Sequence, residues 1–266
     1  MRFVAAPEYP VFPTLERPLK PYEAVVRATP GTRQAVASAK PDVVVHDVLT
    51  LAPALAAELE GVPAATVIPH LHPAPFAGFP PYALGARLPR TGASRALWRA
   101  LERPVARGLE RGRRELNETR ARLGLTPQTR LLGGISEQLC IVGTFPQLEY
   151  PRAWPERTHV VGPLTWEPPY HEVDPPPGED PLVLVAPSTA HDTDQRLLRA
   201  ALAGLTREPV RVLAAINRRT GANALSVPPN ARVVDWLSYS RTMPRCALVI
   251  THAGHGTLAR ALACGC

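Results

Sequence analysis

Short apolar runs that do not alternate with polar residues constrain the fold of this chain more than any other feature. The stretch PDVVVHDVLTLAPALAAELEGVPAATVIPHLHP, residues 41–73, holds two such runs. Between them a helical pattern begins at Thr50 and ends at Gly61. A strand that is apolar on both faces is typical of a parallel sheet covered by helices on both sides. We therefore predict a βαβ unit within a doubly wound α/β sheet.

A second series of the same kind fills the last third of the chain. The runs LVLVA, VRVLAAI, ARVV and ALVIT predict strands there, and QLCIVGT and HVVG predict two further strands in the first half. We expect a helix from about His191 to Gly204 and another at the end of the chain. The stretch PLTWEPPYHEVDPPPGEDP between the halves has the proline and acid content of an exposed linker.

These patterns predict two Rossmann-like domains joined by a Pro-rich linker. We assign residues 1–165 to a partial first domain, 166–180 to the linker and 181–266 to a partial second domain. Each half has fewer strands and helices than a complete domain, so we expect a protein truncated at both ends.

Residues 94–123 carry leucines and a valine near helical spacing, with nine arginines on the other positions. Pro104 and two glycines are expected to break or bend this helix. A basic amphipathic helix can lie on a membrane surface, but a solvated helix face is the interpretation that we favour.

Composition narrows the class of protein. The net charge is +7, which permits an anionic ligand, nucleic acid or a membrane surface as partner. Four cysteines in 266 residues give no disulfide framework, and no leader pattern opens the chain, so we expect a reducing cytoplasm. The apolar runs are shorter than the ~20 residues that span a bilayer. We expect at most peripheral membrane contact.

The closing stretch THAGHGTLARALACGC predicts a glycine turn between a strand and a helix that begins near Thr257. Unpaired N–H groups at such a helix start can bind phosphate. Gly254 and Gly256 allow close approach of an anion, Thr257 can cap the helix, and His252 can donate a hydrogen bond. The residues from Gly254 to Ala259 also fit the pattern GxGxxA, which is typical of a dinucleotide-binding turn. This stretch alone is equally compatible with a turn that binds no ligand.

Upstream residues add a family resemblance. The stretch VVDWLSYSRTMPRCALVITHAGHGTLARAL resembles the donor box of nucleotide-sugar glycosyltransferases of the GT-B fold, including plant secondary-product enzymes and bacterial macrolide glycosyltransferases. The resemblance implies base stacking by Trp236 and main-chain contacts to the base by Leu237. It implies that the diphosphate is held by His252, Gly254, Gly256 and Thr257.

The resemblance extends to other segments. PLVLVAPSTAHDTDQRLLRAALAGL resembles the first strand and helix of the donor domain, which implies that Ser188 and Thr189 face the diphosphate. PDVVVHDVLTLAPALAAELEGVPAA and LNETRARLGLTP resemble acceptor-domain segments. The chain departs from the family in reading WLSY where WLPQ is frequent, and in carrying Arg260 where a ribose-binding Glu is usual. We hypothesise that Arg260 pairs with phosphate.

Members of this family transfer a hexose from a UDP- or dTDP-sugar to a small hydroxylated or lipid-like acceptor, with inversion and without metal or other cofactor. A His base oriented by an Asp activates the acceptor, and the resemblance assigns the Asp role to Asp47. An Asp that caps the following turn is an equally good interpretation. The GHxxP element that carries the base does not occur before Asp47. His70 and His72 are weak candidates for the acceptor cleft.

The family's DQ pair, which holds the sugar and follows the donor box, does not follow the box in this sequence. We therefore expect that the 266-residue chain turns over no nucleotide sugar. A nucleotide-binding fragment without catalysis, with a dinucleotide or a nucleotide sugar as ligand, is the alternative.

Two other kinds of site are disfavoured. A metal site built from His252, His255, Cys264 and Cys266 has a spacing that matches no standard pattern. Binding to nucleic acid is disfavoured because the arginine-rich helix has few aromatic residues and no recognised motif.

Overall fold

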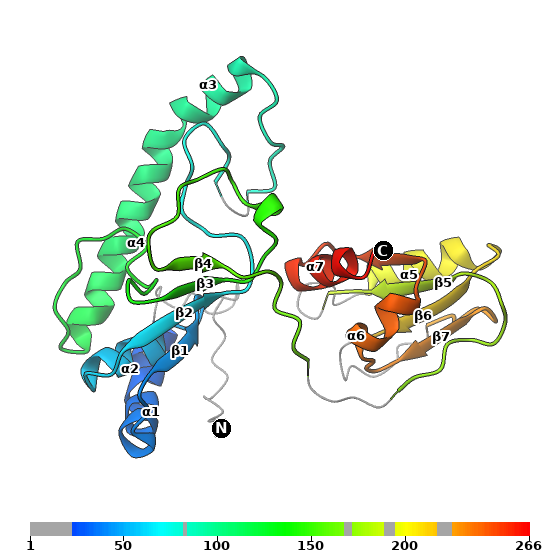
Figure 1. Ribbon diagram of the computed structural model, residues 1–266, viewed down its shortest axis with the longest axis horizontal. Helices are drawn as coiled ribbons and strands as arrows, with labels where there is room; N and C mark the ends of the chain where they lie inside the picture. Colours follow the sequence, from blue (N-terminus) through cyan, green and yellow to red (C-terminus); the bar gives the residue numbers. More distant parts are fainter. Residues whose placement is uncertain (1–22, 82–83, 168–171, 189–194, 217–224) are drawn as a thin grey trace. The chain divides into compact units, whose positions relative to one another are not determined.

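The computed structural model describes residues 23–81, 84–167, 172–188, 195–216 and 225–266. The chain divides between Gly162 and Pro163 into two compact units, each with its own parallel four-stranded sheet (Figure 1). The predicted α/β class is thus confirmed, with two separate parallel sheets in one chain. No helix in the described ranges is long and apolar enough to cross a bilayer.

The first unit is a parallel sheet in the order β1-β2-β3-β4 with helices between the strands. Its elements are α1 (Glu23–Ala39), β1 (Val44–Asp47), α2 (Ala52–Leu59), β2 (Ala64–Ile68), α3 (Gly92–Ala100), α4 (Glu102–Arg122), β3 (Cys140–Val142), the 3₁₀ turn η1 (Pro146–Leu148) and β4 (Thr158–Val160). Ile68, Cys140 and Val142 form a buried cluster on the central strands. Helix α1 was not predicted from the sequence.

The predicted βαβ unit is confirmed as β1, α2 and β2. Gly61 ends α2 with a φ of +67°, which an L side chain rarely adopts, and Val62 N–H donates to the Ala57 carbonyl at 2.9 Å. The prediction that the first strand is covered on both faces is wrong, because Val43 and Val45 are 49% and 59% exposed. The reason is position: β1 is the outer strand of the described sheet and has one neighbour only.

The helix predicted over residues 94–123 is two helices, α3 and α4, which meet at Leu101. Pro104 lies in the first turn of α4, where its missing N–H has no partner to lose. Further along α4, the buried Arg120 donates to both carboxylate oxygens of Glu58 on α2, each at 2.6 Å. This bidentate pair fixes α4 against α2.

The second unit is a parallel sheet in the order β7-β6-β5-β8. Its elements are β5 (Leu182–Ala186), α5 (Arg196–Leu205), β6 (Arg211–Ala215), β7 (Ala231–Val234), α6 (Tyr239–Thr242), the 3₁₀ turn η2 (Met243–Arg245), β8 (Leu248–Thr251) and α7 (His255–Ala263). All five residues of β5 are buried, as expected for an inner parallel strand. The four strands predicted for this half are confirmed.

The described part of the predicted linker is held against the second unit. The Asp174 carbonyl accepts from the Arg232 guanidinium at 2.8 Å, and the Asp180 carbonyl accepts from Arg211 Nε at 2.8 Å. These bonds run from the segment to β7 and β6. The segment is therefore hydrogen-bonded to this sheet, and most of its described residues are exposed, as predicted.

Candidate nucleotide-binding edge

The carboxyl ends of β5 and β8 lie side by side in the second unit. Ala186, the last residue of β5, is in register with Thr251, the last residue of β8. The buried Ser188 and the exposed His252 therefore follow neighbouring strand ends. Carboxyl ends of parallel strands are the usual ligand-binding edge of an open α/β sheet. Thr189, predicted to face the same ligand, lies outside the described residues.

The glycine turn after β8 starts α7 earlier than predicted. Ala253 has a φ of +62° and Gly254 is the N-cap residue, so α7 begins at His255. The predicted cap role of Thr257 is wrong, because the left-handed step at Ala253 brings the helix start forward and puts Thr257 within its first turn. Gly254 has no side chain, so the N-cap residue itself supplies no side-chain hydrogen bond to the helix start. A helix start of this kind can bind an anion through its N–H groups.

The two glycines of the turn have different surroundings. A Cβ added at Gly254 would lie 2.4 Å from Nε2 of His252, so the imidazole is folded over that glycine. A Cβ added at Gly256 would meet nothing within 4 Å. A side chain at 254 would therefore displace the His252 imidazole, whereas at 256 the protein leaves room above the helix start.

Trp236 and Leu237 follow β7 at the same edge. The Trp236 side chain is 42% exposed, whereas Leu237 is 4% exposed and packs with Met243 and with Ala261 of α7. Three strand spacings separate β7 from β8, which is about 14 Å before the loop folds back toward α7. An exposed indole and an uncapped helix start at this spacing suit an extended ligand with a flat ring at one end and an anion at the other.

Arg260 on α7 is not available to a phosphate in this structure. The residue is 9% exposed, pairs with the Glu167 carboxylate and donates to the Thr165 carbonyl at 2.7 Å. The hypothesised pairing with phosphate is therefore corrected: the local partner of this buried guanidinium is a carboxylate of the same unit.

Glu167 is a residue that the sequence reasoning missed, because it was assigned to the linker. Besides Arg260, its carboxylate accepts from the hydroxyls of Ser238 and Ser240 and from the Ser240 N–H at 3.2 Å. Burial acts to raise the pKa of Glu167, but the serine hydrogen bonds and the Arg260 charge outweigh burial and hold the pKa below its usual value. Glu167 thus ties the start of α6 to α7 as an ionised carboxylate.

Asp47 ends β1 in the first unit, as predicted. Its Oδ1 accepts a hydrogen bond from the Leu49 N–H at 2.8 Å, which is the turn-capping geometry. The neighbouring His46 is 4% exposed, and its Nε2 lies 2.8 Å from the Thr66 hydroxyl. Burial lowers the pKa of His46. Geometrically, Asp47 shapes a turn, and His46 is a hydrogen-bonded core residue.

The two histidines assigned to the acceptor cleft follow β2. Nδ1 of His70 is 2.8 Å from the Leu71 carbonyl, which can only accept, so this nitrogen carries the proton. Nδ1 of His72 instead accepts from the Ala74 N–H at 3.2 Å. Burial, with the nearby positive charge of Arg152 and His70, lowers the pKa of His72 to about 4. His72 is therefore neutral at pH 7, with its lone pair already engaged.

An arginine surrounded by aromatic rings lies beside His72 and was not found from the sequence. The Arg152 guanidinium carbon is 5.9, 5.7 and 5.5 Å from the ring centres of Phe76, Tyr150 and Trp154. One of its terminal nitrogens donates to the Ala74 carbonyl at 2.8 Å, whereas its Nε and other terminal nitrogen are buried without a partner. Burial lowers the pKa of Arg152. The rings replace water as neighbours of this cation.

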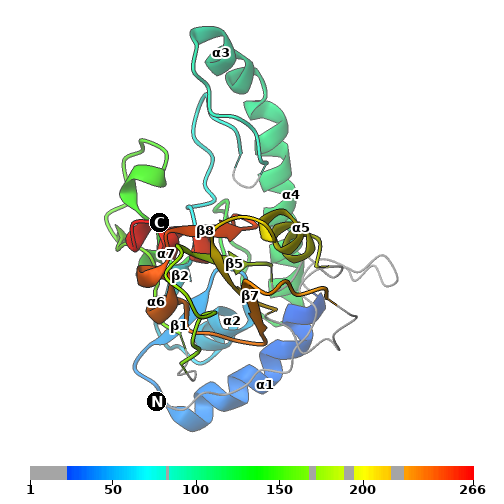
Figure 2. The same cartoon turned by 90° about the vertical axis from the view of Figure 1, so that its right-hand side faces the viewer.

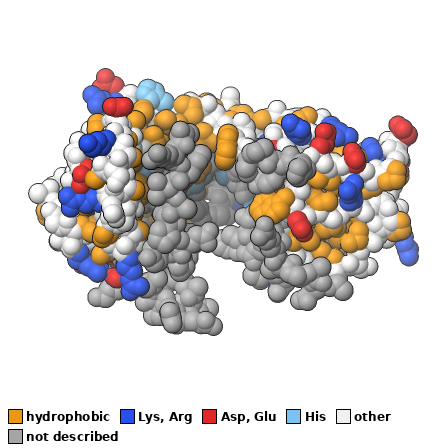
Figure 3. Space-filling model, turned by 90° about the horizontal axis from the view of Figure 1, so that it is seen from below, with side chains coloured by type: hydrophobic (Ala, Val, Ile, Leu, Met, Phe, Trp, Pro, Cys, Tyr) orange, Lys and Arg blue, Asp and Glu red, His pale blue; other side chains and the backbone are white. Residues whose placement is uncertain are grey.

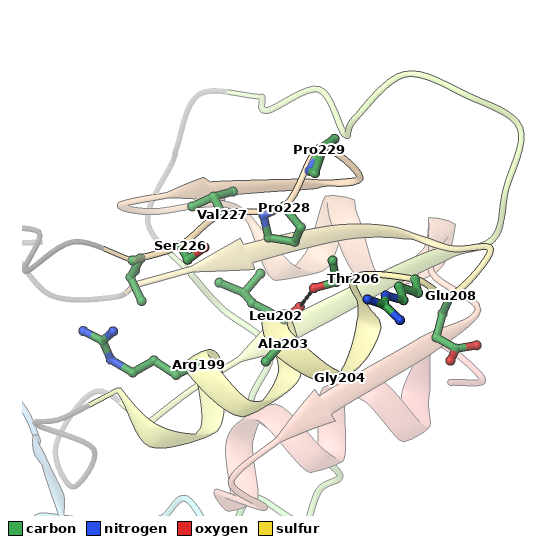
Figure 4. Close-up of a pocket in the computed structure, with 12 residues that line it drawn as sticks. Arg199, Leu202, Ala203, Gly204, Thr206, Glu208, Ser226, Val227, Pro228 and Pro229 are labelled. Atoms are coloured by element: carbon green, nitrogen blue, oxygen red, sulfur yellow. Dashed lines mark hydrogen bonds between the residues drawn. The ribbon is translucent and has the colours of Figure 1, made fainter.

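A cavity lies in the second unit away from the candidate edge. A cavity of about 860 Å³ is lined by the end of α5 and the loop before β7 (Figure 4). It lies at the amino ends of β6 and β7, opposite the edge that carries Trp236. Within the described ranges, no three His, Cys, Asp or Glu side chains are grouped to hold a metal. The Cys266 thiol donates to the Met243 carbonyl at 3.2 Å.

The two parallel sheets with their connecting helices place the chain in the α/β class, and comparison with known proteins specifies the fold. No protein-family model matches the chain. The chain is 31% identical over 245 residues to 4'-demethylrebeccamycin synthase of Lentzea aerocolonigenes, covering 84% of this chain and 55% of that one. It is 33% identical over 166 residues to O-mycaminosyltylonolide 6-deoxyallosyltransferase of Streptomyces fradiae, covering 58% and 38%.

Solved structures confirm the fold. The glycosyltransferase of kitacinnamycin matches with a TM-score of 0.64 at 19% identity, over 91% of this chain and 60% of that one. The Streptomyces sp. SF2575 glycosyltransferase SsfS6, complexed with thymidine diphosphate, matches with a TM-score of 0.55 at 21% identity, over 91% and 54%. The chain is therefore a relative of the antibiotic glycosyltransferases and has the GT-B fold. It spans about half the length of the curated relatives that it matches.

Proposed function

We propose that the second unit binds the nucleotide diphosphate of a UDP- or dTDP-sugar, and that the whole protein transfers the sugar to a hydroxyl of a small-molecule acceptor. One observation carries this proposal: the exposed Trp236 after β7 and the start of α7 after β8, whose N-cap residue is Gly254, lie at the carboxyl edge of the same sheet. A solved neighbour with thymidine diphosphate bound supports it.

Inversion without a metal ion is the mechanism that we propose for the whole protein. The N–H groups at the start of α7 and the imidazole of His252 can donate hydrogen bonds where the leaving diphosphate develops negative charge. This is the stabilisation that a metal ion would otherwise provide. A cytoplasmic location is part of the proposal, and the four free thiols of the chain are compatible with it.

Titration calorimetry of the 266-residue chain with UDP and dTDP tests the proposal. We expect saturable binding that EDTA does not weaken. Substituting Trp236→Ala should weaken binding by about 10- to 100-fold, because a base loses its stacking surface. Trp166→Ala is the matched control, since Trp166 lies in the same unit and is 78% exposed.

Other results would contradict the proposal. Tighter binding of NAD⁺ than of either nucleoside diphosphate would favour the dinucleotide alternative, and binding that needs Mg²⁺ would exclude the metal-independent mechanism. Equal losses in the Trp236 and Trp166 variants would show that the site lies elsewhere.

A further inference from the structure

Residues 84–111, here called the arm, extend from the first unit away from its sheet. The arm consists of the loop before α3, helix α3 and the first half of α4, and both views show α3 remote from β1 to β4 (Figures 1 and 2). Helix α3 has nine residues and none of them is buried. So short a helix is marginal in water without packing partners, which makes its uncovered surface a candidate contact surface.

The arm concentrates the positive charge of the protein. It holds seven arginines and two glutamates, a net charge of +5 in a chain whose total is +7. The arginines are Arg87, Arg90, Arg95, Arg99, Arg103, Arg107 and Arg111. Among the described residues only Arg111 has a carboxylate partner, Glu115 at 2.9 Å. By contrast, the face shown in Figure 3 carries acidic and basic side chains side by side in both units.

Four leucines are exposed among these arginines. Leu84, Leu88, Leu97 and Leu101 are 58%, 59%, 60% and 38% exposed. A single exposed leucine is ordinary on a protein surface. Four of them within eighteen residues, with six unpaired arginines in the same arm, form a surface that is both apolar and cationic.

The loop that holds Gly78 contacts α3 on the side of Arg95, and Arg95 and Arg99 stay exposed there. Gly78 N–H donates to Glu102 at 3.2 Å, and a Cβ at Gly78 would lie 3.5 Å from the Arg95 carbonyl oxygen. Leu97 and Leu101, one helical turn apart, project from a different side of the helix than Arg95. The leucines thus face away from the loop that supports α3.

We propose that the arm docks on an anionic phospholipid bilayer, with the leucines entering the headgroup region and the arginines meeting lipid phosphates. The combination of leucines and arginines favours a bilayer as the partner. Nucleic acid would contact the arginines and leave the four leucines in water, whereas a bilayer surface contacts both the leucines and the arginines. The arm also projects, and a projecting element meets a soft surface more readily than it meets a groove of fixed shape. This inference is independent of the proposed nucleotide site.

Co-sedimentation of the 266-residue chain with vesicles tests the inference. We expect binding to vesicles of phosphatidylcholine mixed with phosphatidylglycerol, weak binding to phosphatidylcholine alone, and a decrease as salt rises. A Leu97→Ser/Leu101→Ser variant and an Arg103→Gln/Arg107→Gln variant should each bind mixed vesicles about tenfold more weakly. Glutamine preserves helix propensity, so the second variant keeps α4 intact.

The matched control is Arg157→Gln/Arg207→Gln, which removes the same charge from exposed positions outside the arm. It should bind mixed vesicles like the unaltered chain. Circular dichroism establishes that each variant is folded. Three results would overturn the inference: no vesicle binding, equal weakening by the control, or duplex DNA binding that exceeds vesicle binding and ignores the leucine substitutions. Self-association through the arm, seen as a dimer in ultracentrifugation that the leucine variant abolishes, would assign the surface to a second copy instead.

Discussion

The carboxyl edges of the two sheets differ in how their polar groups are satisfied. In the first unit Asp47 accepts from a main-chain N–H, His72 accepts from another, and Arg152 is enclosed by three aromatic rings. In the second unit the start of α7 has no side-chain cap and Trp236 is exposed. At the first edge the Asp47 carboxylate and His72 Nδ1 already have main-chain partners, whereas at the second edge the N-cap residue of α7 is a glycine and Trp236 is exposed.

This difference indicates which groups of the protein can contribute free energy to ligand binding. A group that already has an internal partner gains little from a ligand, since one hydrogen bond replaces another. A helix start can donate N–H hydrogen bonds to an anion, and an exposed ring can stack on a flat ligand. Four substitutions or conditions test this contrast, from the largest expected change in free energy to the smallest.

Arg152→Ala should destabilise the first unit by about 3 kcal/mol, because the three rings lose their cation and the Ala74 carbonyl loses its donor. Urea denaturation followed by tryptophan fluorescence measures the loss. Nucleotide affinity should not change. Arg157→Ala is the control, since Arg157 is exposed. A similar loss in both variants would mean that the ring cluster adds no stability of its own.

Acid should destabilise the first unit through His72. The pKa of His72 is about 4 in the folded chain, against an ordinary value of 6.5 in the unfolded chain. Between these pH values the unfolded chain therefore binds a proton that the folded chain does not. Stability therefore falls as the pH drops from about 6.5 to about 4, by about 1 kcal/mol per pH unit. Above pH 6.5 His72 adds no pH dependence.

His72→Asn should flatten this slope in urea titrations at several pH values, because asparagine keeps an acceptor for the Ala74 N–H and cannot be protonated. The exposed His159 provides the control substitution His159→Asn, which should leave the slope intact. An unchanged slope in the His72 variant would assign the acid sensitivity to other groups.

Gly256→Ala should weaken binding of UDP or dTDP about tenfold without lowering stability, since alanine is favoured over glycine within a helix. The added methyl meets no protein atom within 4 Å, so any loss reports on the ligand. Calorimetry measures the affinity. Gly204→Ala makes the same change on α5, where the added methyl also meets nothing, and should have no effect on binding. Equal affinity of the Gly256 variant and the unaltered chain would place the diphosphate away from α7.

Ala253→Gly should stabilise the second unit by about 0.5 kcal/mol. Glycine relieves the left-handed φ of +62°, although it also makes the unfolded chain more flexible. Thermal unfolding detects the difference. Ala263→Gly, within regular α7, should have the opposite sign. Destabilisation by both would show that Ala253 is not strained.

Much of the fold was predictable, because it depends on local patterns. Unbroken apolar runs identified the strands of both sheets, and Gly61 marked the end of α2. Helix α1 was missed, since Pro30 within it is a helix-breaking signal that the structure tolerates. The break at Leu101 was anticipated at Pro104 and lies three residues earlier, because proline is accommodated in the first turn of α4.

The candidate site was predictable where its residues are contiguous. Trp236 and the glycine turn come from one stretch of sequence, and Ser188 follows a recognisable strand. Arg260 pairs with Glu167, which lies 93 positions earlier in the sequence, so no local sequence pattern could predict this ion pair. The ring cluster around Arg152 was missed for the same reason: it unites residues that follow β2 with residues that follow β3.

The Glu167 contacts have a consequence for building chimeras between relatives. Ser238, Ser240 and Arg260 all bind this one carboxylate, so a transplanted donor box without Glu167 would leave a buried guanidinium without its counter-ion. A graft that starts at the first strand of the second sheet would make that error. The smallest exchangeable module therefore begins before Thr165, whose carbonyl also holds Arg260.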